Sequence, residues 1–160
     1  MRSATPPAVS LMLVTSGTPN GPPVNATDLN AFATKYTAAW CSQNAASVAS
    51  FFAEHGSLTI NGGSPAVGGT AITASAQGFM TAFPDLIVAM DSLTHDRGRI
   101  EYHWTLSGMN TGPGGTGNHV RISGYESWTF SSDGLIASSL GYYDEADYRR
   151  QLNGPAPRAP

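Results

Sequence analysis

The sequence predicts an α+β domain in which a curved, mostly antiparallel sheet wraps around a long N-terminal helix. Two observations lead to this prediction. Apolar residues follow helical spacing in most of the first half of the chain, which contains a single short strand. The second half alternates apolar and polar residues through consecutive strands. Helices followed by a run of strands indicate an α+β fold, and we expect the sheet to curl into a cone around the first helix, with a pocket at its open end.

The first helix is expected to begin near Thr27, whose hydroxyl suits an N-cap, and to end near Gln43. A short second helix is expected to follow Asn44 and to end at residues 54–56, before a brief strand over residues 57–61. The apolar residues of the first helix recur at the spacing of one helical face: Leu29, Phe32, Tyr36 and Trp40.

A third helix is expected to open at Gly68-Gly69-Thr70. It should end before Pro84, because proline lacks the amide donor that a helix interior needs. Two strands are then expected over residues 86–93 and 99–108. The glycine-rich stretch over residues 110–118 is expected to form the loop that follows them.

Residues 120–144 are expected to form two long strands joined by a turn at Ser132-Asp133-Gly134, because Asp-Gly between alternating runs is a strong hairpin signal. In the first of these strands, Glu126 shares the inward phase of Gly124 and Trp128. Burying an ionised and unpaired carboxylate is very costly. Glu126 is therefore expected to be protonated, to be paired, or to line a cavity.

We expect one domain over residues 25–152, closed by a short helix over residues 144–152, with flexible tails over residues 1–24 and 153–160. The net charge is −3 and no cluster of Lys or Arg occurs, which disfavours nucleic-acid binding. The single cysteine, Cys41, excludes a disulfide within the chain. No apolar run is long enough for a transmembrane helix. A cytoplasmic location is expected, with export as a minority alternative because the apolar run near the N-terminus is short.

A series of short segments is informative through its order and spacing. The segments are Tyr36-Thr-Ala-Ala-Trp40, Phe51-Phe52-Ala53-Glu54, Gly68-Gly69-Thr70-Ala71-Ile72, Phe83-Pro84-Asp85-Leu86, Trp104-Thr-Leu-Ser-Gly108, and Ser123-Gly124-Tyr125-Glu126 through Asp133-Gly134-Leu135-Ile136. In this order the chain resembles the SnoaL-like polyketide cyclase family, within the nuclear transport factor/ketosteroid isomerase superfamily. The resemblance covers residues 25–152 and implies the cone fold, which hosts unrelated activities.

The resemblance implies that an acidic residue on the penultimate strand acts as general acid/base, and Glu126 stands there as Glu rather than the usual Asp. Relative to ketosteroid isomerases, Tyr36 matches the oxyanion-binding tyrosine, whereas the general base falls at Asn61, an amide that cannot abstract a proton. The segment Gly108-Met109-Asn110-Thr111-Gly112 lacks the histidine that cyclases tend to carry. The Asp-Arg-Asp set of limonene-epoxide hydrolases falls on His103, Thr105 and Gly141.

The residues and the resemblance together suggest a small-molecule enzyme that cyclises or isomerises a hydrophobic carbonyl compound by proton transfer. The catalytic candidates are Glu126 and Tyr36, and no cofactor is required. The alternative is a non-catalytic ligand-binding or interaction domain of the same fold. Glu126 is equally compatible with a structural carboxylate held by Tyr36, Tyr142 or a backbone donor. The substrate-binding candidates are Trp40, Asn61, Trp128 and Tyr142.

The expected partners are a small hydrophobic ligand and a second copy of the chain. The outward phases of two neighbouring strands carry His103 and Tyr125, and such sheet faces suit an isologous homodimer. No metal is expected, because the histidines at 55, 95, 103 and 119 fit no metal-ligand spacing.

Overall fold

The computed structural model describes residues 26–154. The expectation for residues 1–24, and that for the second tail beyond residue 154, therefore lie outside the described part of the chain. The described elements, in chain order, are α1 (Ala26–Cys41), α2 (Ala45–Ala49), β1 (Phe52–Ile60), β2 (Ala66–Val67), α3 (Gly69–Ala82), β3 (Ile87–Asp96), β4 (Arg99–Met109), β5 (His119–Phe130), β6 (Ile136–Tyr143) and α4 (Glu145–Asn153).

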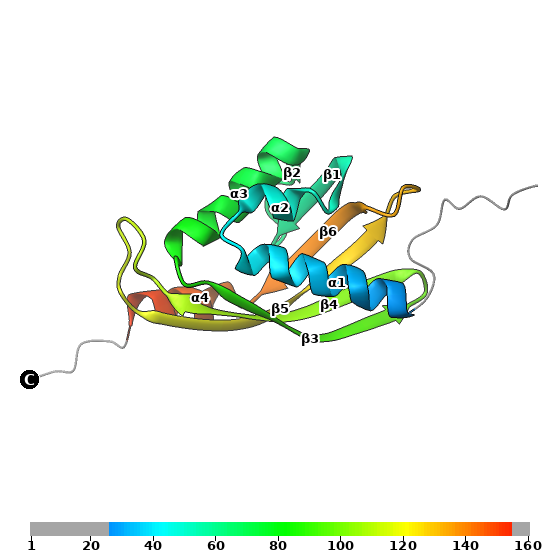
Figure 1. Ribbon diagram of the computed structural model, residues 1–160. Helices are drawn as coiled ribbons and strands as arrows, with labels where there is room; N and C mark the ends of the chain where they lie inside the picture. The colour runs from blue at the N-terminus through cyan, green and yellow to red at the C-terminus, as the bar shows by residue number, and fades with distance from the viewer. Residues whose placement is uncertain (1–25, 155–160) are drawn as a thin grey trace, which may run out of the picture.

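The strands form one six-stranded sheet in the order β2-β1-β6-β5-β4-β3. Neighbouring strands are antiparallel except β1 and β6, which run parallel. Figure 1 shows the sheet curving beneath α1, with α2 and α3 on the same side of it. The predicted α+β class, with a curved and mostly antiparallel sheet against a long first helix, is confirmed.

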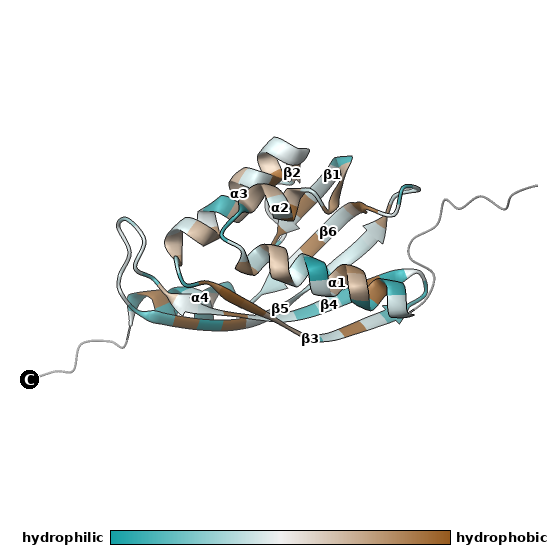
Figure 2. Cartoon of the chain, in the orientation of Figure 1, coloured by the Kyte–Doolittle hydropathy of each residue, from teal (hydrophilic) through white to brown (hydrophobic). Residues whose placement is uncertain are grey.

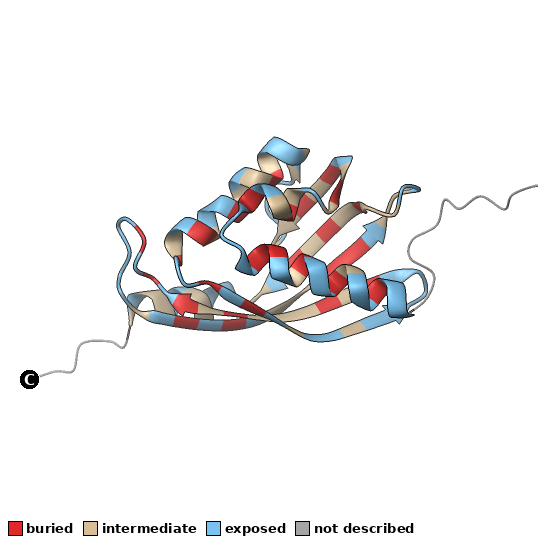
Figure 3. Ribbon diagram, viewed as in Figure 1, coloured by how far each residue is buried: buried red, intermediate tan, exposed pale blue. Residues whose placement is uncertain are grey.

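Helix α1 buries one face against the sheet and exposes the other. Figure 3 shows this face as buried bands along the helix, and the buried positions Leu29, Ala33, Tyr36 and Trp40 lie three or four residues apart. Thr27 lies in the first turn of the helix rather than before it, because α1 already begins at Ala26. The helix therefore points Tyr36 and Trp40 at the inner face of the sheet.

Strand β1 is longer than the sequence indicates. The expected end of the second helix at residues 54–56 is wrong, since β1 already begins at Phe52. Phe52 pairs with Ile136 of β6, and the register shifts before Ser57. The backbone at Gly56 approaches Ile136 so closely that an added Cβ would lie 2.7 Å from the Ile136 carbonyl oxygen. Pairing with a strand that lies much later in the chain thus converts this segment into sheet.

Strand β3 also exceeds its expected range and runs to Asp96. Residues 91–96 are mostly exposed, so they lack the apolar alternation that marks a buried strand. They pair with β4 across a turn at Arg97 and Gly98, both of which have positive φ. The short strand β2, which pairs with β1, was not predicted for the same reason, because its two residues are not buried.

The core lies between the helices and the inner face of the sheet. Figure 2 shows hydrophobic bands on α1 and along the strands beneath it. Tyr102 of β4 stacks on Trp128 of β5 with ring centroids 4.8 Å apart, and Tyr36 meets Trp128 edge-on at 5.1 Å. Helix α4 begins as expected, with the Asp144 side chain accepting a hydrogen bond from the Asp147 amide.

Candidate functional site

Glu126 is buried on the inner face of the sheet, where the phase of β5 predicted it. Only 6% of the Glu126 surface is exposed. In the sheet register it lies opposite Tyr102 on β4 and opposite Gly141 on β6. The carboxylate thus stands at the middle of the sheet, beneath α1, among apolar and aromatic side chains.

Three side chains donate hydrogen bonds to one oxygen of this carboxylate, Oε1. The Tyr36 hydroxyl of α1 donates at 2.8 Å, and the Ser139 hydroxyl of β6 donates at 2.7 Å. The indole N–H of Trp128, two positions along β5, donates over a longer 3.4 Å. Three different elements therefore converge on Oε1 and fix the orientation of the carboxyl group.

The second oxygen, Oε2, is left for the cavity. Within residues 26–154, all hydrogen bonds to the Glu126 carboxyl group are accepted by Oε1. No fully buried side-chain nitrogen or oxygen in this range lacks a partner, so Oε2, which has none, is not fully buried. Glu126 also lines a cavity. The carboxyl group is thus divided, with one oxygen held by the protein and the other available to a ligand.

Burial controls the protonation of this site. Burial raises the pKa of Glu126 above its ordinary value, and the hydrogen bonds from Ser139, Tyr36 and Trp128 oppose this rise without cancelling it. Burial also raises the pKa of Tyr36 well above its ordinary value, and the adjacent Glu126 charge raises it further. The pKa of Tyr102 is raised too, again mainly by burial. Both phenols are therefore neutral near pH 7.

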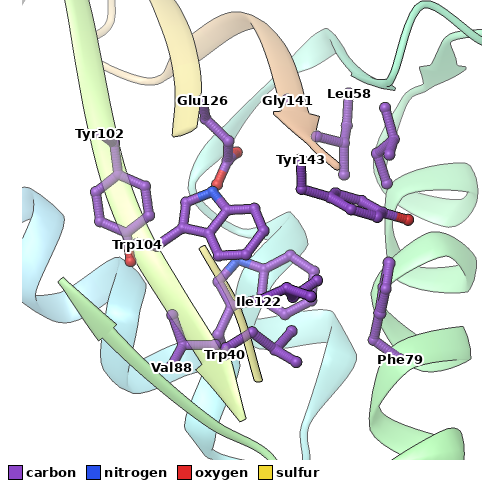
Figure 4. Close-up of a pocket in the computed structure, with 12 residues that line it drawn as sticks. Trp40, Leu58, Phe79, Val88, Tyr102, Trp104, Ile122, Glu126, Gly141 and Tyr143 are labelled. Atoms are coloured by element: carbon purple, nitrogen blue, oxygen red, sulfur yellow. The ribbon is translucent and has the colours of Figure 1, made fainter. Parts of the chain in front are cut away.

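A cavity lies between α1, α3 and the inner face of the sheet, with Glu126 in its wall (Figure 4). Its volume is about 50 Å³, and the empty space reaches about 530 Å³ when the region open to solvent is included. We call it the Glu126 cavity, and its walls are formed by Trp40, Leu58, Ile60, Phe79, Val88, Tyr102, Trp104, Leu106, Ile122, Glu126, Gly141 and Tyr143. Among these twelve residues Glu126 alone carries a charged side chain.

Two glycines near Glu126 leave space that a side chain would otherwise fill. An added Cβ at Gly124 would lie 2.6 Å from the Trp104 ring, so the absence of a side chain lets Trp104 lie across β5. Gly141 faces Glu126 across the β5–β6 pair, and an added Cβ there would meet the Glu126 side chain at 3.6 Å. A larger residue at Gly141 would therefore fit the backbone but would occupy cavity space.

The structure brings together four of the sequence-predicted site residues. Tyr36 and Trp128 donate hydrogen bonds to Oε1 of Glu126, and Trp40 lines the cavity. Asn61 is not among the cavity residues; its side-chain oxygen accepts a hydrogen bond from the Tyr143 amide at 3.0 Å. Its backbone has positive φ, and its amide donates to the Gly141 carbonyl oxygen.

Tyr142 lies on the opposite face of the sheet from Glu126. It is 39% exposed, and its ring packs on Tyr125, with ring centroids 5.3 Å apart. The neighbouring residue Tyr143 lines the cavity instead. The tyrosine hydroxyl that the structure places against Glu126 is therefore that of Tyr36 and not that of Tyr142.

Sequence reasoning missed Ser139 and most of the cavity walls. Ser139 is fully buried, although it is a polar residue that directly follows another serine. Counting inward positions from Gly141 would have selected Ser139, because alternate residues of a strand share a face. The expectation that Tyr143 belongs to an aromatic cavity wall agrees with its position in the structure. Likewise, the inward phase of β4 places Tyr102 and Trp104 in the cavity wall. The sequence contained this signal, but the register of β6 against β5 was needed to use it.

Within the described range, no group of three or more His, Cys, Asp or Glu side chains is arranged to hold a metal ion. Across the same residues, the structure contains no helix with the length and apolarity needed to cross a membrane. The His103 ring lies on the outer face of the sheet and contacts the Glu101 carboxylate at 3.1 Å.

The curved sheet packed against α1 has the ketosteroid isomerase-like, or nuclear transport factor 2-like, cone fold. The family model for SnoaL-like polyketide cyclases matches residues 30–152. The chain belongs to this family. A comparison with curated protein sequences gives no match.

Solved structures share the fold at low sequence identity. A hypothetical protein with a ketosteroid isomerase-like fold from Catenulispora acidiphila, in complex with trimethylamine, has a TM-score of 0.68 and 17% identity, over 81% of this chain and 97% of that one. A putative polyketide cyclase from Xanthomonas campestris has a TM-score of 0.68 and 17% identity, over 79% and 97%. AclR, a putative hydroxylase from Streptomyces galilaeus, has a TM-score of 0.64 and 18% identity, over 75% and 91%.

Proposed function

We propose that the chain is a small-molecule enzyme in which Glu126 performs acid–base chemistry of the cyclase or isomerase type on a hydrophobic carbonyl compound. The observation that carries this proposal is the division of the Glu126 carboxyl group. Oε1 accepts three hydrogen bonds from the protein, whereas Oε2 is left for the cavity. Oε2 is then the atom that exchanges a proton with a bound substrate.

Burial and hydrogen bonding act on Glu126 in opposite directions, and this balance suits a group that must both take and return a proton. Burial favours the protonated carboxyl, which donates from Oε2 to a carbonyl oxygen. The donors on Oε1 stabilise the carboxylate that remains after the transfer. As the ionised form, Oε2 removes a proton from the carbon beside a carbonyl group and can return it to another carbon of the same substrate.

Tyr36 acts through Glu126 in this proposal. The Tyr36 hydroxyl donates its single proton to Oε1 of Glu126, and Tyr36 is fully buried. It is therefore a positioning residue that orients the carboxyl and tunes its pKa, rather than a direct donor to the substrate. Trp40 and the other aromatic walls bind the hydrophobic part of the substrate.

The size of the cavity limits which part of a substrate reaches Glu126. About 50 Å³ holds on the order of three to five water-sized atoms, so one end of the substrate enters while the remainder occupies the open region. A ketone-bearing ring edge or a short acyl group is consistent with this volume. A substrate with several fused rings would extend through the mouth of the cavity.

Deuterium incorporation tests this function without requiring the natural substrate. Small cyclic and acyclic ketones are incubated with the protein in D₂O, and exchange at the carbon beside the carbonyl is followed by NMR. Acceleration is expected for the native chain and should be lost in Glu126→Gln, which cannot transfer a proton. Ser138→Ala is the matched control, because the Ser138 hydroxyl bonds Thr129 on the outer face. A panel of ketones that binds in the cavity without any accelerated exchange would contradict the proposal.

The second candidate function is ligand binding without turnover. It is favoured by the scarcity of polar groups in the cavity, since no second charged side chain lines it and the Tyr102 hydroxyl bonds Thr37 at 2.6 Å. The similar structure from Catenulispora acidiphila was solved with trimethylamine, a ligand without a carbonyl group. Saturable binding in the cavity together with an absence of exchange would favour this second function.

We also propose that two copies of the chain associate through the outer face of the sheet. On this face Tyr125 packs against both His103 and Tyr142, with ring centroids 5.4 and 5.3 Å apart. Ile87 is 60% exposed at the β3 edge of the same face. Aromatic and aliphatic side chains on the outer face of the sheet support an isologous interface.

A further inference from the structure

Among residues 26–154, the carboxylate of Glu126 has no positively charged partner. None of the twelve cavity residues is Lys, Arg or His. The hydrogen bonds to Oε1 come from two hydroxyl groups and one indole, which are all neutral. An ionised Glu126 therefore carries a buried charge that the protein stabilises only by neutral donors, and Oε2 remains open to a partner of opposite charge.

Aromatic rings form much of the wall around this carboxyl group. Figure 4 shows the side chains of Trp40, Phe79, Tyr102, Trp104 and Tyr143 around the space that Glu126 lines. The faces of aromatic rings attract cations, and several rings around one carboxylate are the chemistry that recognises alkylated ammonium groups. Methyl groups on such a cation also bury their apolar surface against the rings, which a hydrated ammonium ion does not.

We propose that the Glu126 cavity binds a small alkylammonium cation, with the ionised Glu126 carboxylate as its counter-ion and the aromatic walls around its methyl groups. A tertiary ammonium donates its N–H to Oε2, and a quaternary ammonium makes the charge contact without a hydrogen bond. This inference uses the cavity of the proposed function but does not depend on its proton-transfer chemistry.

The volume of the cavity agrees with this ligand class. Trimethylammonium has four non-hydrogen atoms, and the cavity of about 50 Å³ has room for roughly three to five water-sized atoms. Larger substituents on the nitrogen would project toward the open region. The cavity therefore selects the alkylated nitrogen itself rather than the remainder of a larger molecule.

Binding of such a cation should depend on pH through Glu126. The other titratable groups that face its carboxyl are phenols, namely Tyr36 on α1 and Tyr102 on β4, and Tyr143 on β6 lines the same cavity. Burial raises the pKa of each of these phenols, so they remain neutral while Glu126 titrates. A cation that is charged at every pH should bind more tightly as pH rises through the pKa of Glu126.

Tetramethylammonium is the probe, because its charge does not titrate, and tert-butanol is the neutral comparison with similar methyl groups. Binding is measured by calorimetry and by NMR shifts of the Trp40 and Trp104 indole N–H groups, between pH 5 and 9. Tetramethylammonium is expected to bind at least about tenfold more tightly than tert-butanol at the upper end of this range, and its affinity should fall toward the lower end.

Two variants locate the site. Glu126→Gln keeps the shape of the side chain and removes its charge, so it should lower tetramethylammonium affinity by about tenfold or more, abolish its pH dependence and leave tert-butanol binding unchanged. Gly141→Val places methyl groups in the cavity, so it should weaken the binding of both compounds. Circular dichroism establishes that each variant is folded before binding is compared.

Equal affinity for tetramethylammonium and tert-butanol in the native chain, at every pH, would overturn the inference even if neither variant folds. Unchanged tetramethylammonium affinity in either folded variant would also overturn it. The proposed enzyme activity fails separately. Ketone exchange that depends on Glu126, in a protein that does not bind the cation, would leave the proposed function standing and remove this inference.

Discussion

Tyr36 and Glu126 are ninety positions apart in the sequence, and the phenol of the first donates a 2.8 Å hydrogen bond to the buried carboxylate of the second. The next residue of α1, Thr37, lies 2.6 Å from the hydroxyl of a different tyrosine, Tyr102. The Thr37 hydroxyl donates to the Ala33 carbonyl oxygen, so Tyr102 donates to Thr37. Two adjacent helix positions therefore hold the carboxyl and a cavity wall in place.

Replacing Glu126 by Gln should be tolerated, whereas Glu126→Ala should destabilise the fold. Glutamine keeps an oxygen at the position of Oε1, where it accepts the bonds from Tyr36, Ser139 and Trp128. Alanine leaves these buried donors without an acceptor, which costs about 1–3 kcal/mol. Chemical denaturation of the three proteins at pH 7 measures the free energies of unfolding. Equal losses in the Gln and Ala variants would show that these hydrogen bonds are not what Glu126 contributes to the fold.

The stability of the native chain should fall relative to Glu126→Gln as pH rises above the ordinary value of 4.5. Because burial raises the pKa of Glu126 in the folded state, the folded protein keeps this proton where the unfolded chain has lost it. The stabilisation is present below about 4.5 and is lost as pH rises through the folded pKa, by at most about 1.4 kcal/mol per pH unit. Melting temperatures of both proteins between pH 4 and 9 provide the measurement. A difference that is constant over this range would mean that the folded pKa is not raised.

Tyr36→Phe should raise the pKa of Glu126 further, while Tyr102→Phe should leave it unchanged. The Tyr36 hydroxyl bond lowers that pKa and is removed in the first variant, whereas the Tyr102 hydroxyl bonds Thr37 instead. Both variants keep an aromatic ring, and loss of the Tyr36 bond should cost about 0.5–1.5 kcal/mol. Carboxyl ¹³C NMR titration of the labelled protein reports the pKa directly. Equal pKa values in the native chain and Tyr36→Phe would rule out the positioning role of Tyr36.

The native chain should have the mass of a dimer in light scattering at micromolar concentration. Tyr125→Glu should shift it toward the monomer, because a carboxylate would be buried without a partner at an interface formed by this face. Val67→Glu is the control, since Val67 is 57% exposed on β2, the opposite edge strand of the sheet from β3. A monomeric native chain would exclude the interface, and dissociation by Val67→Glu alone would place it elsewhere.

The order of the elements and the inward direction of Glu126 followed from the sequence. Helical spacing places Tyr36 and Trp40 on one face of α1, and period-two alternation places Glu126 with Trp128 in β5. Both patterns are local, because side-chain direction within one element depends only on backbone geometry. The Asp144 cap of α4 is predictable for the same reason, since its bond to the Asp147 amide lies within one turn. A carboxylate among apolar inward positions was therefore visible without any knowledge of its surroundings.

The partners of Glu126 were decided only by the tertiary structure. Pairing of Glu126 with Gly141 turns Ser139 and Tyr143 inward and leaves Tyr142 on the outer face, although all three lie in one short strand. This register includes a shift between Thr129 and Phe130, which alternation within either strand does not reveal. Likewise, β1 forms because Phe52 meets Ile136 across a parallel pair. The sequence thus determined which way each side chain points within its own element, whereas contacts between distant elements determined what each side chain meets.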